Sequence, residues 1–505
     1  MTQTFPMLPG ECWWGGCVNQ GHLMPLNEKS SVLMDPFHGR ENDQFAPLYV
    51  SSKGRYLWSE RPYTLRAENG VMTCEGAGEA VLSEGHDNLK GAYLAACAAH
   101  FPFTGTLPDQ RFFTQPQYNT WIELGTDQTT DNILRYARGI LEHGLPAGIL
   151  MIDEGWQQDY GVFEFNKTKI PDPARLIYDL HQMGFAVMLW VTPNVACAGP
   201  HYYPLRDKGY LLRDKDGKIA IREWWTGFTA VLDLTHPEAS HWYHGELRRL
   251  MECYGVDGFK FDAGDVYFYQ DDDQSHVPML AREQTAVFNE IGAQYSLNEF
   301  RAAWKFGGQP IAARLHDKYH SWDHFGLNTL IPHTLLQGLL GYAYCCPDMV
   351  GGGMIGCFDK GQKMDEELFV RWAQANAFMG MMQMSVSPWR VLTEENAALV
   401  VEAMKLHASL GEKCHALAQH AAKTGEPITR HMAYAFPGEG LECADTQFML
   451  GDDLLAAPVL EQGAKEKTVF LPRGHWQDWK GQVWEGGRAV TLPVTLADIP
   501  HFTRL

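Results

Sequence analysis

The central part of the chain alternates between two hydrophobic patterns. Short apolar runs with few polar interruptions are followed by longer stretches, such as 242–254, in which apolar positions recur every three to five residues. The first pattern indicates strands buried on both faces, and the second indicates amphipathic helices. The apolar runs predict strands at 117–124, 147–153, 185–192, 258–262, 295–300, 311–317, 342–348 and 381–386. The helical pattern predicts helices at 130–143, 173–183, 237–254, 366–378 and 394–407. Eight strands that alternate with helices are typical of an α/β protein built on a (β/α)8 TIM barrel.

The pattern differs on both sides of this region. Before it, short alternating runs lie between Gly, Pro, Asn and Asp residues, and a helical period occurs only at about 90–99. After about Leu410 the pattern again predicts strands and turns. We therefore expect three domains: an N-terminal β-sandwich (1–110), the barrel (111–410) with an insert around 200–230, and a C-terminal β-sandwich (411–505).

Composition and charge exclude several classes of partner. The 505 residues carry a net charge of −20 and show no basic patch, which argues against nucleic acid and anionic membranes as partners. No stretch reaches the ~20 apolar residues of a membrane span, and the first residues lack a secretion signal, so we expect a cytoplasmic protein if the sequence is complete. The 11 cysteines include no CxxC pair and are expected to be reduced. The histidines show no HExxH spacing, so we expect no metal and no cofactor.

Several predicted strands end in, or just before, a side chain that can do chemistry. Such side chains converge on one pocket at the top of a barrel. They are Asp153, Trp190, Asp262, Arg301, Asp317 and Asp348. Asp262 alone could equally cap a helix or pair with Lys260, which points to the same face of its strand.

Four carboxylates with Lys260 and Arg301 fit three kinds of site. They could hold a divalent metal, bind a polyol, or cleave a glycosidic bond. Metal sites of this kind usually include His, and none of these strands ends in one. Glycosidic cleavage needs two carboxyls, one ionised and one protonated.

The segment Gly258-Phe259-Lys260-Phe261-Asp262 resembles the nucleophile strand of glycoside hydrolase family 31. Further resemblances to that family follow in its order from about residue 117 to the end of the chain, and the N-terminal region is similar only in its β character. They lie at 224–228, 233–237, 348–352, 387–390 and 448–459.

The resemblance implies that Asp262 is the nucleophile. Family members commonly read G-D-N-x-x-x-W-D-x-L around the acid/base, and this spacing assigns the acid/base to Asp317 and a structural role to Asp323, which follows Trp322. The residues expected to bind the sugar are Asp153, Trp190, Trp225, Lys260, Arg301 and Asp348. Core packing is an equal alternative for the two tryptophans.

One departure bears on the substrate. The α-glucosidases of the family usually have His-Asp before [I/V]-G-G, whereas Pro347 precedes Asp348 here. With 330–332 and 259–264, this looks most like the branch that contains myogenesis-regulating glycosidase and bacterial α-galactosidases. The resemblance implies a retaining, exo-acting α-glycoside hydrolase of TIM-barrel fold that acts on a small oligosaccharide or glycoside, with α-galactosides as the expected substrates.

Other functions stay open at this point. The same machinery serves α-glucosidases, α-xylosidases and transglycosylases. A sugar-binding barrel without activity and a metal-dependent hydrolase are alternatives of other classes. A homo-oligomer is compatible with the sequence.

Overall fold

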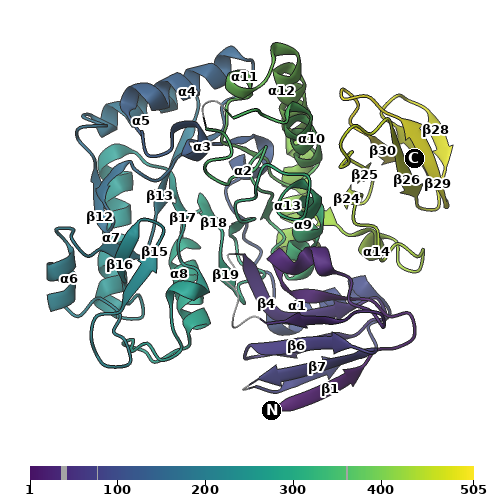
Figure 1. Ribbon diagram of the computed structural model, residues 1–505, viewed down its shortest axis with the longest axis horizontal. Helices are drawn as coiled ribbons and strands as arrows, with labels where there is room; N and C mark the ends of the chain where they lie inside the picture. Colours follow the sequence, from purple (N-terminus) through teal and green to yellow (C-terminus); the bar gives the residue numbers. More distant parts are fainter. Residues whose placement is uncertain (36–42, 77, 360–361) are drawn as a thin grey trace.

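Eight parallel strands form a nearly closed barrel in a computed structural model that describes residues 1–35, 43–76, 78–359 and 362–505 (Figure 1). Their order around the barrel is β22-β9-β10-β13-β17-β18-β20-β21. A hydrogen bond of 2.8 Å from Val350 N to Gln383 O bridges the two ends of this order. The strands are β9 (Gln117–Asn119), β10 (Ile149–Ile152), β13 (Ala186–Val191), β17 (Gly258–Phe261), β18 (Asn298–Phe300), β20 (Ala312–Arg314), β21 (Cys345–Cys346) and β22 (Gln383–Met384). The predicted fold class, a TIM barrel with β domains on both sides, is confirmed.

Helices surround the barrel. Those that lie where the sequence predicted them are α4 (Thr130–Glu142), α5 (Pro173–Gln182), α7 (Pro237–Tyr254), α10 (Glu366–Asn376) and α12 (Glu394–Ser409). The structure adds α8 (Ala281–Gly292) and α9 (Leu330–Leu339), for which the sequence analysis named no helix. In α7, Tyr243, Leu247 and Leu250 are buried on one face, because residues three and four apart share a side of a helix. The helix ends at Gly255, whose φ of 81° suits glycine, and the chain turns into β17. This turn sets the direction of the strand that precedes Asp262.

Several barrel strands are shorter than predicted. The expected strand at 117–124 ends at Asn119, whose side chain accepts a hydrogen bond of 2.8 Å from Trp121 N, and α3 (Trp121–Leu124) follows. Asp317 and Asp348 also lie beyond their strands, in loops. The Asp348 carboxylate accepts hydrogen bonds from Lys318 N and Gly353 N at 2.7 and 2.9 Å. At these strand ends, hydrogen bonds from backbone N–H groups to side chains thus replace the hydrogen bonds between neighbouring strands.

A second correction concerns the region after Leu410. The chain does not return at once to strands but forms α13 (Gly411–Thr424), which ends at Gly425 with a φ of 80°. Its buried side chains Cys414, Ala418 and Ala421 are spaced by four and three residues. The helical period is present but is carried by small residues, which give a weak hydrophobic signal.

The N-terminal region consists of two sheets and one long helix. One sheet has the order β1-β7-β6-β3, and the other has the order β19-β4-β5-β8 with β2 also paired to β4. The elements are β1 (Thr2–Pro6), β2 (Trp13–Cys17), β3 (Val32–Met34), β4 (Gln44–Ser51), β5 (Tyr56–Ser59), β6 (Tyr63–Glu68), β7 (Val71–Gly76), β8 (Ala80–Ser83) and α1 (Leu89–His100).

The second of these sheets is joined to the barrel. Its edge strand β19 (Ala303–Trp304) belongs to the connection between β18 and β20, where a helix would complete the βα unit. Gln44 Nε2 donates to Arg301 O at 2.6 Å and to Arg314 O at 2.9 Å. The N-terminal sheets therefore help to position the part of the barrel that carries the site.

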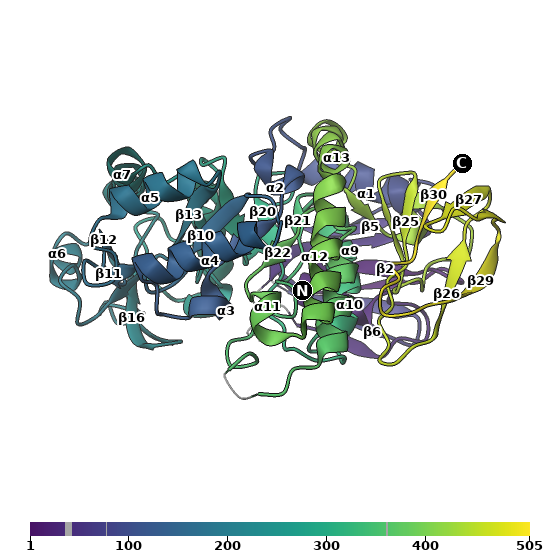
Figure 2. The same ribbon diagram turned by 90° about the horizontal axis from the view of Figure 1, so that it is seen from above.

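The C-terminal region is a small β domain beside the barrel, shown in yellow in Figure 1. A six-stranded sheet contains β23 (Thr429–Arg430), β24 (Phe448–Leu450), β25 (Leu454–Ala456), β30 (His501–Arg504), β27 (His475–Asp478) and β28 (Val483–Glu485), and a two-stranded sheet pairs β26 (Glu466–Leu471) with β29 (Arg488–Pro493). Figure 2 shows α10 between the barrel and these strands. Gln374 Nε2 of α10 donates to Leu496 O at 2.7 Å.

The expected insert around 200–230 contains α6 (Tyr202–Asp207) and a three-stranded sheet. The strands β14 (Asn194–Ala196), β16 (Gly227–Val231) and β15 (Ile221–Trp224) form this sheet. Trp225 lies in the turn between β15 and β16. None of the helices in the described residues has the length and apolar character needed to cross a bilayer.

Candidate active site

A cavity of about 530 Å³ lies at the carboxyl ends of the barrel strands. This volume lies in the range of small-molecule sites. Its lining comprises Trp121, Thr126, Asp153, Glu154, Trp190, Trp225, Thr226, Lys260, Asp262, Arg301, His316, Asp317, Met354 and Ile355. The structure therefore brings together all the predicted site residues except Asp348.

Asp262 is held by three neighbouring side chains, those of Trp190, Arg301 and Lys260. Its Oδ2 accepts a hydrogen bond of 2.9 Å from Trp190 Nε1, and Oδ1 lies 3.2 Å from a guanidinium nitrogen of Arg301. Burial alone would raise the pKa of Asp262, but Arg301, Lys260 and the Trp190 hydrogen bond outweigh burial and hold this pKa well below its ordinary value. Asp262 is thus ionised at neutral pH, as a nucleophile must be.

Lys260 joins Asp262 to a second carboxylate. Its ammonium lies 2.7 Å from Asp153 Oδ2 and 4.0 Å from Asp262 Oδ2. Burial would lower the pKa of Lys260, but the charge of Asp153 outweighs it and the pKa is raised. Lys260 therefore stays charged and favours the anionic form of Asp262.

Arg301 is held by Asp265, a residue to which the sequence analysis assigned no role. Arg301 donates a hydrogen bond of 2.8 Å to Asp265 Oδ2, and its guanidinium lies 5.0 Å from the centre of the Trp225 ring. Burial raises the pKa of Asp265 to about 7, with Arg301 opposing the rise and Asp262 adding to it. Asp265 is buried and absent from the lining of the cavity, so we assign it the positioning of Arg301.

Asp317 is held by Arg314, a buried arginine at the end of β20. Arg314 donates to Asp317 Oδ1 at 2.9 Å and to Asp348 Oδ1 at 3.1 Å, and it lies 3.2 Å from Glu299 Oε1. Asp317 reaches the cavity, and its side chain is 25% exposed. Asp323, in contrast, is exposed, is absent from the lining and accepts a hydrogen bond of 3.0 Å from Phe325 N.

Asp348 is not placed to touch a ligand. It is fully buried, and burial, with Asp317 adding to the effect, raises its pKa to about 7. Its oxygens bind Arg314, Lys318 N and Gly353 N. We therefore correct the expected role: Asp348 fixes the loops that carry Asp317 rather than binding the sugar itself.

The two tryptophans differ in how far they are exposed, but both line the cavity. Trp190 is buried in an aromatic cluster, yet its N–H is committed to Asp262. Trp225 is 43% exposed, and its ring stacks on Trp224 with a centroid distance of 5.1 Å. Both line the cavity, so neither serves packing alone.

Two ionisable residues of the cavity escaped the sequence analysis. Glu154 directly follows Asp153 and accepts a hydrogen bond from the Tyr160 hydroxyl. Burial raises its pKa, with the Tyr160 hydrogen bond opposing and Asp153 adding to the rise. His316 directly precedes Asp317 and is bonded to Asp43 of the N-terminal region. In both cases the sequence signal that could have found the residue is its place next to a predicted site residue.

The residues around His316 were also tested as metal ligands. Within the ranges that the structure describes, one group has suitable donors: Asp43, His316 and His333, whose ligand atoms lie within 4.8 Å of one another. However, Lys318 Nζ lies 2.9 Å from His333 Nδ1, and His316 Nδ1 lies 2.6 Å from Asp43 Oδ2. The Lys318 side chain and the hydrogen bond between His316 and Asp43 already engage these donors, so we assign no metal to them.

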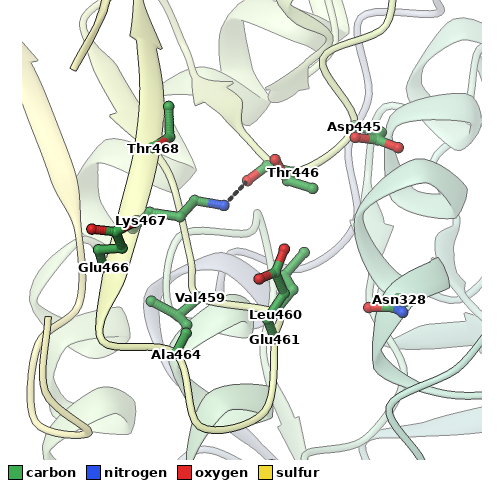
Figure 3. A pocket seen from close by; sticks show the side chains of 10 residues that line it. All are labelled: Asn328, Asp445, Thr446, Val459, Leu460, Glu461, Ala464, Glu466, Lys467 and Thr468. Atoms are coloured by element: carbon green, nitrogen blue, oxygen red, sulfur yellow. Dashed lines mark hydrogen bonds between the residues drawn. The ribbon is translucent and has the colours of Figure 1, made fainter. Parts of the chain in front are cut away.

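A second cavity of about 490 Å³ lies between the C-terminal domain and Asn328 of the barrel region (Figure 3). Lys467 Nζ donates to Thr446 O across it at 3.3 Å, and burial lowers the pKa of Lys467 to about 8 although Glu461 and Asp445 oppose this. Of the ten described residues that line it, none is aromatic. Because sugar rings are usually held on aromatic faces, the cavity at the strand ends is the better candidate site.

Comparison with known proteins gives a consistent result. The model of the glycosyl hydrolases family 31 TIM-barrel domain matches residues 114–411, and that of the family's C-terminal domain matches residues 425–505. Myogenesis-regulating glycosidase of Mus musculus is 34% identical over 419 residues, which cover 80% of this chain and 58% of that protein. Alpha-xylosidase XylQ of Lactiplantibacillus pentosus is 28% identical over 486 residues, covering 88% and 60%. The chain thus spans about three-fifths of the length of these relatives.

Among solved structures, the GH31 alpha-xylosidase from a soil metagenome, complexed with xylose, superimposes with a TM-score of 0.86. The alignment covers 100% of this chain and 79% of that chain at 22% sequence identity. At this identity the likeness concerns the fold alone.

Proposed function

This chain belongs to glycoside hydrolase family 31, and on that premise we propose that it is a retaining, exo-acting α-glycoside hydrolase. The observation that carries the proposal is the state of Asp262, which is held ionised by Arg301, Lys260 and Trp190 in the same cavity as Asp317. A retaining glycosidase needs this combination of an ionised and a second carboxyl.

In the proposed reaction Asp262 attacks the anomeric carbon while Asp317 gives its proton to the departing glycosidic oxygen. The C–O bond to the leaving group breaks as the bond from Asp262 to the sugar forms. Asp317, now ionised, then takes a proton from water, whose oxygen attacks the same carbon and releases Asp262. Arg301 and the N–H of Trp190 keep the Asp262 oxygens in place throughout.

For the glycone we propose α-galactose. The support is Pro347, which stands where α-glucosidases of the family usually carry a histidine donor, together with the branch resemblance of the surrounding motifs. α-Xylose is the second candidate, because a relative at 28% identity is named an alpha-xylosidase. Hydrolysis and transfer to an acceptor sugar use the same first step, so both products belong in the test.

The proposal is tested with 4-nitrophenyl α-galactoside, α-glucoside and α-xyloside at equal concentrations. We expect the highest kcat/KM for the galactoside and an α-configured first product by NMR. Asp262→Ala should abolish turnover and recover it partly with azide, which replaces the missing carboxylate. A higher kcat/KM on the xyloside would reassign the glycone, and a β-configured first product would contradict the retaining mechanism.

The rival interpretation is a sugar-binding barrel without activity. Such a protein has no use for an ionised Asp262 buried beside a second carboxyl, because buried charges are costly to maintain. Binding of the three glycosides without turnover of any of them would establish this rival and refute the hydrolase.

A further inference from the structure

His316 is a ring in the wall of the cavity that the proposed mechanism does not use. Asp43 holds it in two ways: Oδ1 accepts a hydrogen bond of 2.7 Å from His316 N, and Oδ2 lies 2.6 Å from Nδ1. Both the backbone and the ring of His316 are therefore fixed by one carboxylate from the N-terminal region.

The protonation of this pair decides what the ring offers to a ligand. Burial would raise the pKa of Asp43, but the charge of His316, its hydrogen bond and Lys318 outweigh burial and lower the pKa. An ionised carboxylate only accepts hydrogen bonds, so Nδ1 of His316 must carry the hydrogen. Nε2 then accepts a hydrogen bond in the neutral ring and donates one in the charged ring, and a hydroxyl group can pair with either form.

The second nitrogen is left for a ligand. In the part of the chain that the structure describes, the ring atom of His316 with a hydrogen-bond partner is Nδ1; the side chain is 27% exposed and lines the cavity. A fixed ring with a nitrogen available in a small-molecule cavity is suited to bind a hydroxyl group.

The position of His316 indicates which part of the substrate it meets. It directly precedes Asp317, the group that protonates the departing oxygen, whereas Lys260, Asp153 and Trp190 cluster around Asp262. The acid/base faces the leaving group, and His316, the residue that precedes it in the chain, lies on that side.

We propose that His316, oriented by Asp43, binds a hydroxyl of the leaving-group sugar through Nε2 and thereby favours substrates in which a second sugar follows the scissile bond. This rests on the proposed hydrolase function. His316 is a specificity-determining residue in this account, and Asp43 is its positioning residue.

The test compares two substrates with the same glycone. One is an α-linked disaccharide, and the other is the 4-nitrophenyl α-glycoside, whose leaving group has no hydroxyl beyond the one released. For His316→Ala we expect the kcat/KM of the disaccharide to fall about tenfold more than that of the nitrophenyl glycoside, the usual effect of one lost hydrogen bond. The ratio of the disaccharide kcat/KM to the nitrophenyl glycoside kcat/KM does not depend on how much of the variant is folded.

Three further variants sharpen the result. His316→Gln, which keeps an acceptor on the side chain, should recover part of the ratio. In Asp43→Asn the neutral amide no longer requires the hydrogen of the His316 ring to sit on Nδ1. This variant should lower the ratio, as His316→Ala does. His324→Ala removes an exposed ring of the same loop and should leave the ratio as in the wild type.

Two outcomes would overturn the inference alone: equal losses on both substrates for His316→Ala, or no loss on either. A wild-type protein that hydrolyses neither substrate would refute the hydrolase function and this inference with it.

Discussion

Lys260→Met is the perturbation whose effect can be worked out most fully. It removes an ammonium 4.0 Å from Asp262 Oδ2 and keeps a side chain of similar length. At that distance and an effective dielectric constant of about 20, one unit charge contributes about 4 kcal/mol. This corresponds to about 3 pH units in the pKa of Asp262, as an upper bound because Arg301 and Trp190 remain.

The sign of the effect is fixed by the direction of the shift. The pKa of Asp262 is held low in the folded protein, so its ionisation stabilises the fold at neutral pH and this contribution is lost as pH falls through the folded-state pKa. Without Lys260 the pKa rises toward its ordinary value. The acid limb of the kcat/KM profile should therefore move to higher pH, by no more than about 3 units.

The same substitution leaves Asp153 buried without its partner. Removing one member of a buried ion pair costs about 3–5 kcal/mol of unfolding free energy. The double variant Asp153→Asn/Lys260→Met removes both charges and should recover most of that loss while keeping the shifted acid limb. The stability difference between the two variants thus isolates the unpaired charge.

The assays are a pH profile of kcat/KM with a nitrophenyl glycoside and urea unfolding of the three proteins. An acid limb that stays in place in Lys260→Met would show that this lysine does not control Asp262. Equal stability of the single and double variants would refute the reasoning about Asp153.

Three other substitutions test separate parts of the site. Trp190→Phe removes the N–H that bonds Asp262 and should raise the acid limb of kcat/KM by about 1–2 pH units, the equivalent of one charged hydrogen bond; an unmoved limb would contradict this. Gly353→Ala places a Cβ 2.8 Å from Asp317 Oδ1 and should lower kcat about a hundredfold by displacing that carboxyl, and wild-type turnover would show that the loop adapts freely. Asp317→Asn should lower kcat/KM about 10²–10⁴-fold on a disaccharide, whereas the exposed Asp323 in the matched variant Asp323→Asn should be dispensable, and the reverse result would exchange their roles.

Much of the barrel could be predicted because its strands are buried on both faces. The runs that form β10, β13 and β17 are almost wholly apolar, which is typical of parallel strands covered on both faces. The strand ends were harder: β21 and β22 are short because loop contacts, not the ladder, take over the backbone. The hydrophobic pattern of a sequence does not show where the hydrogen bonding between two strands ends.

The carboxylates of the site could be predicted from their places after the strands. The residues that hold them could not, because their partners are remote in sequence. Asp43 and His316 are separated by 273 positions, and Lys260 and Asp153 by 107. No role could be predicted for Asp265, because only the fold shows that it lies against Arg301. The cytoplasmic location and the oligomeric state stay predictions.

The central claim is that Asp262 forms a covalent bond to the sugar, and trapping that bond tests it most directly. A 5-fluoro α-galactosyl fluoride forms such an intermediate faster than water releases it. We predict that intact-protein mass spectrometry will show the addition of one glycosyl residue and that peptide mapping will place it on Asp262. An unmodified Asp262 with the label on another carboxyl, or turnover without any labelled protein, would contradict the account.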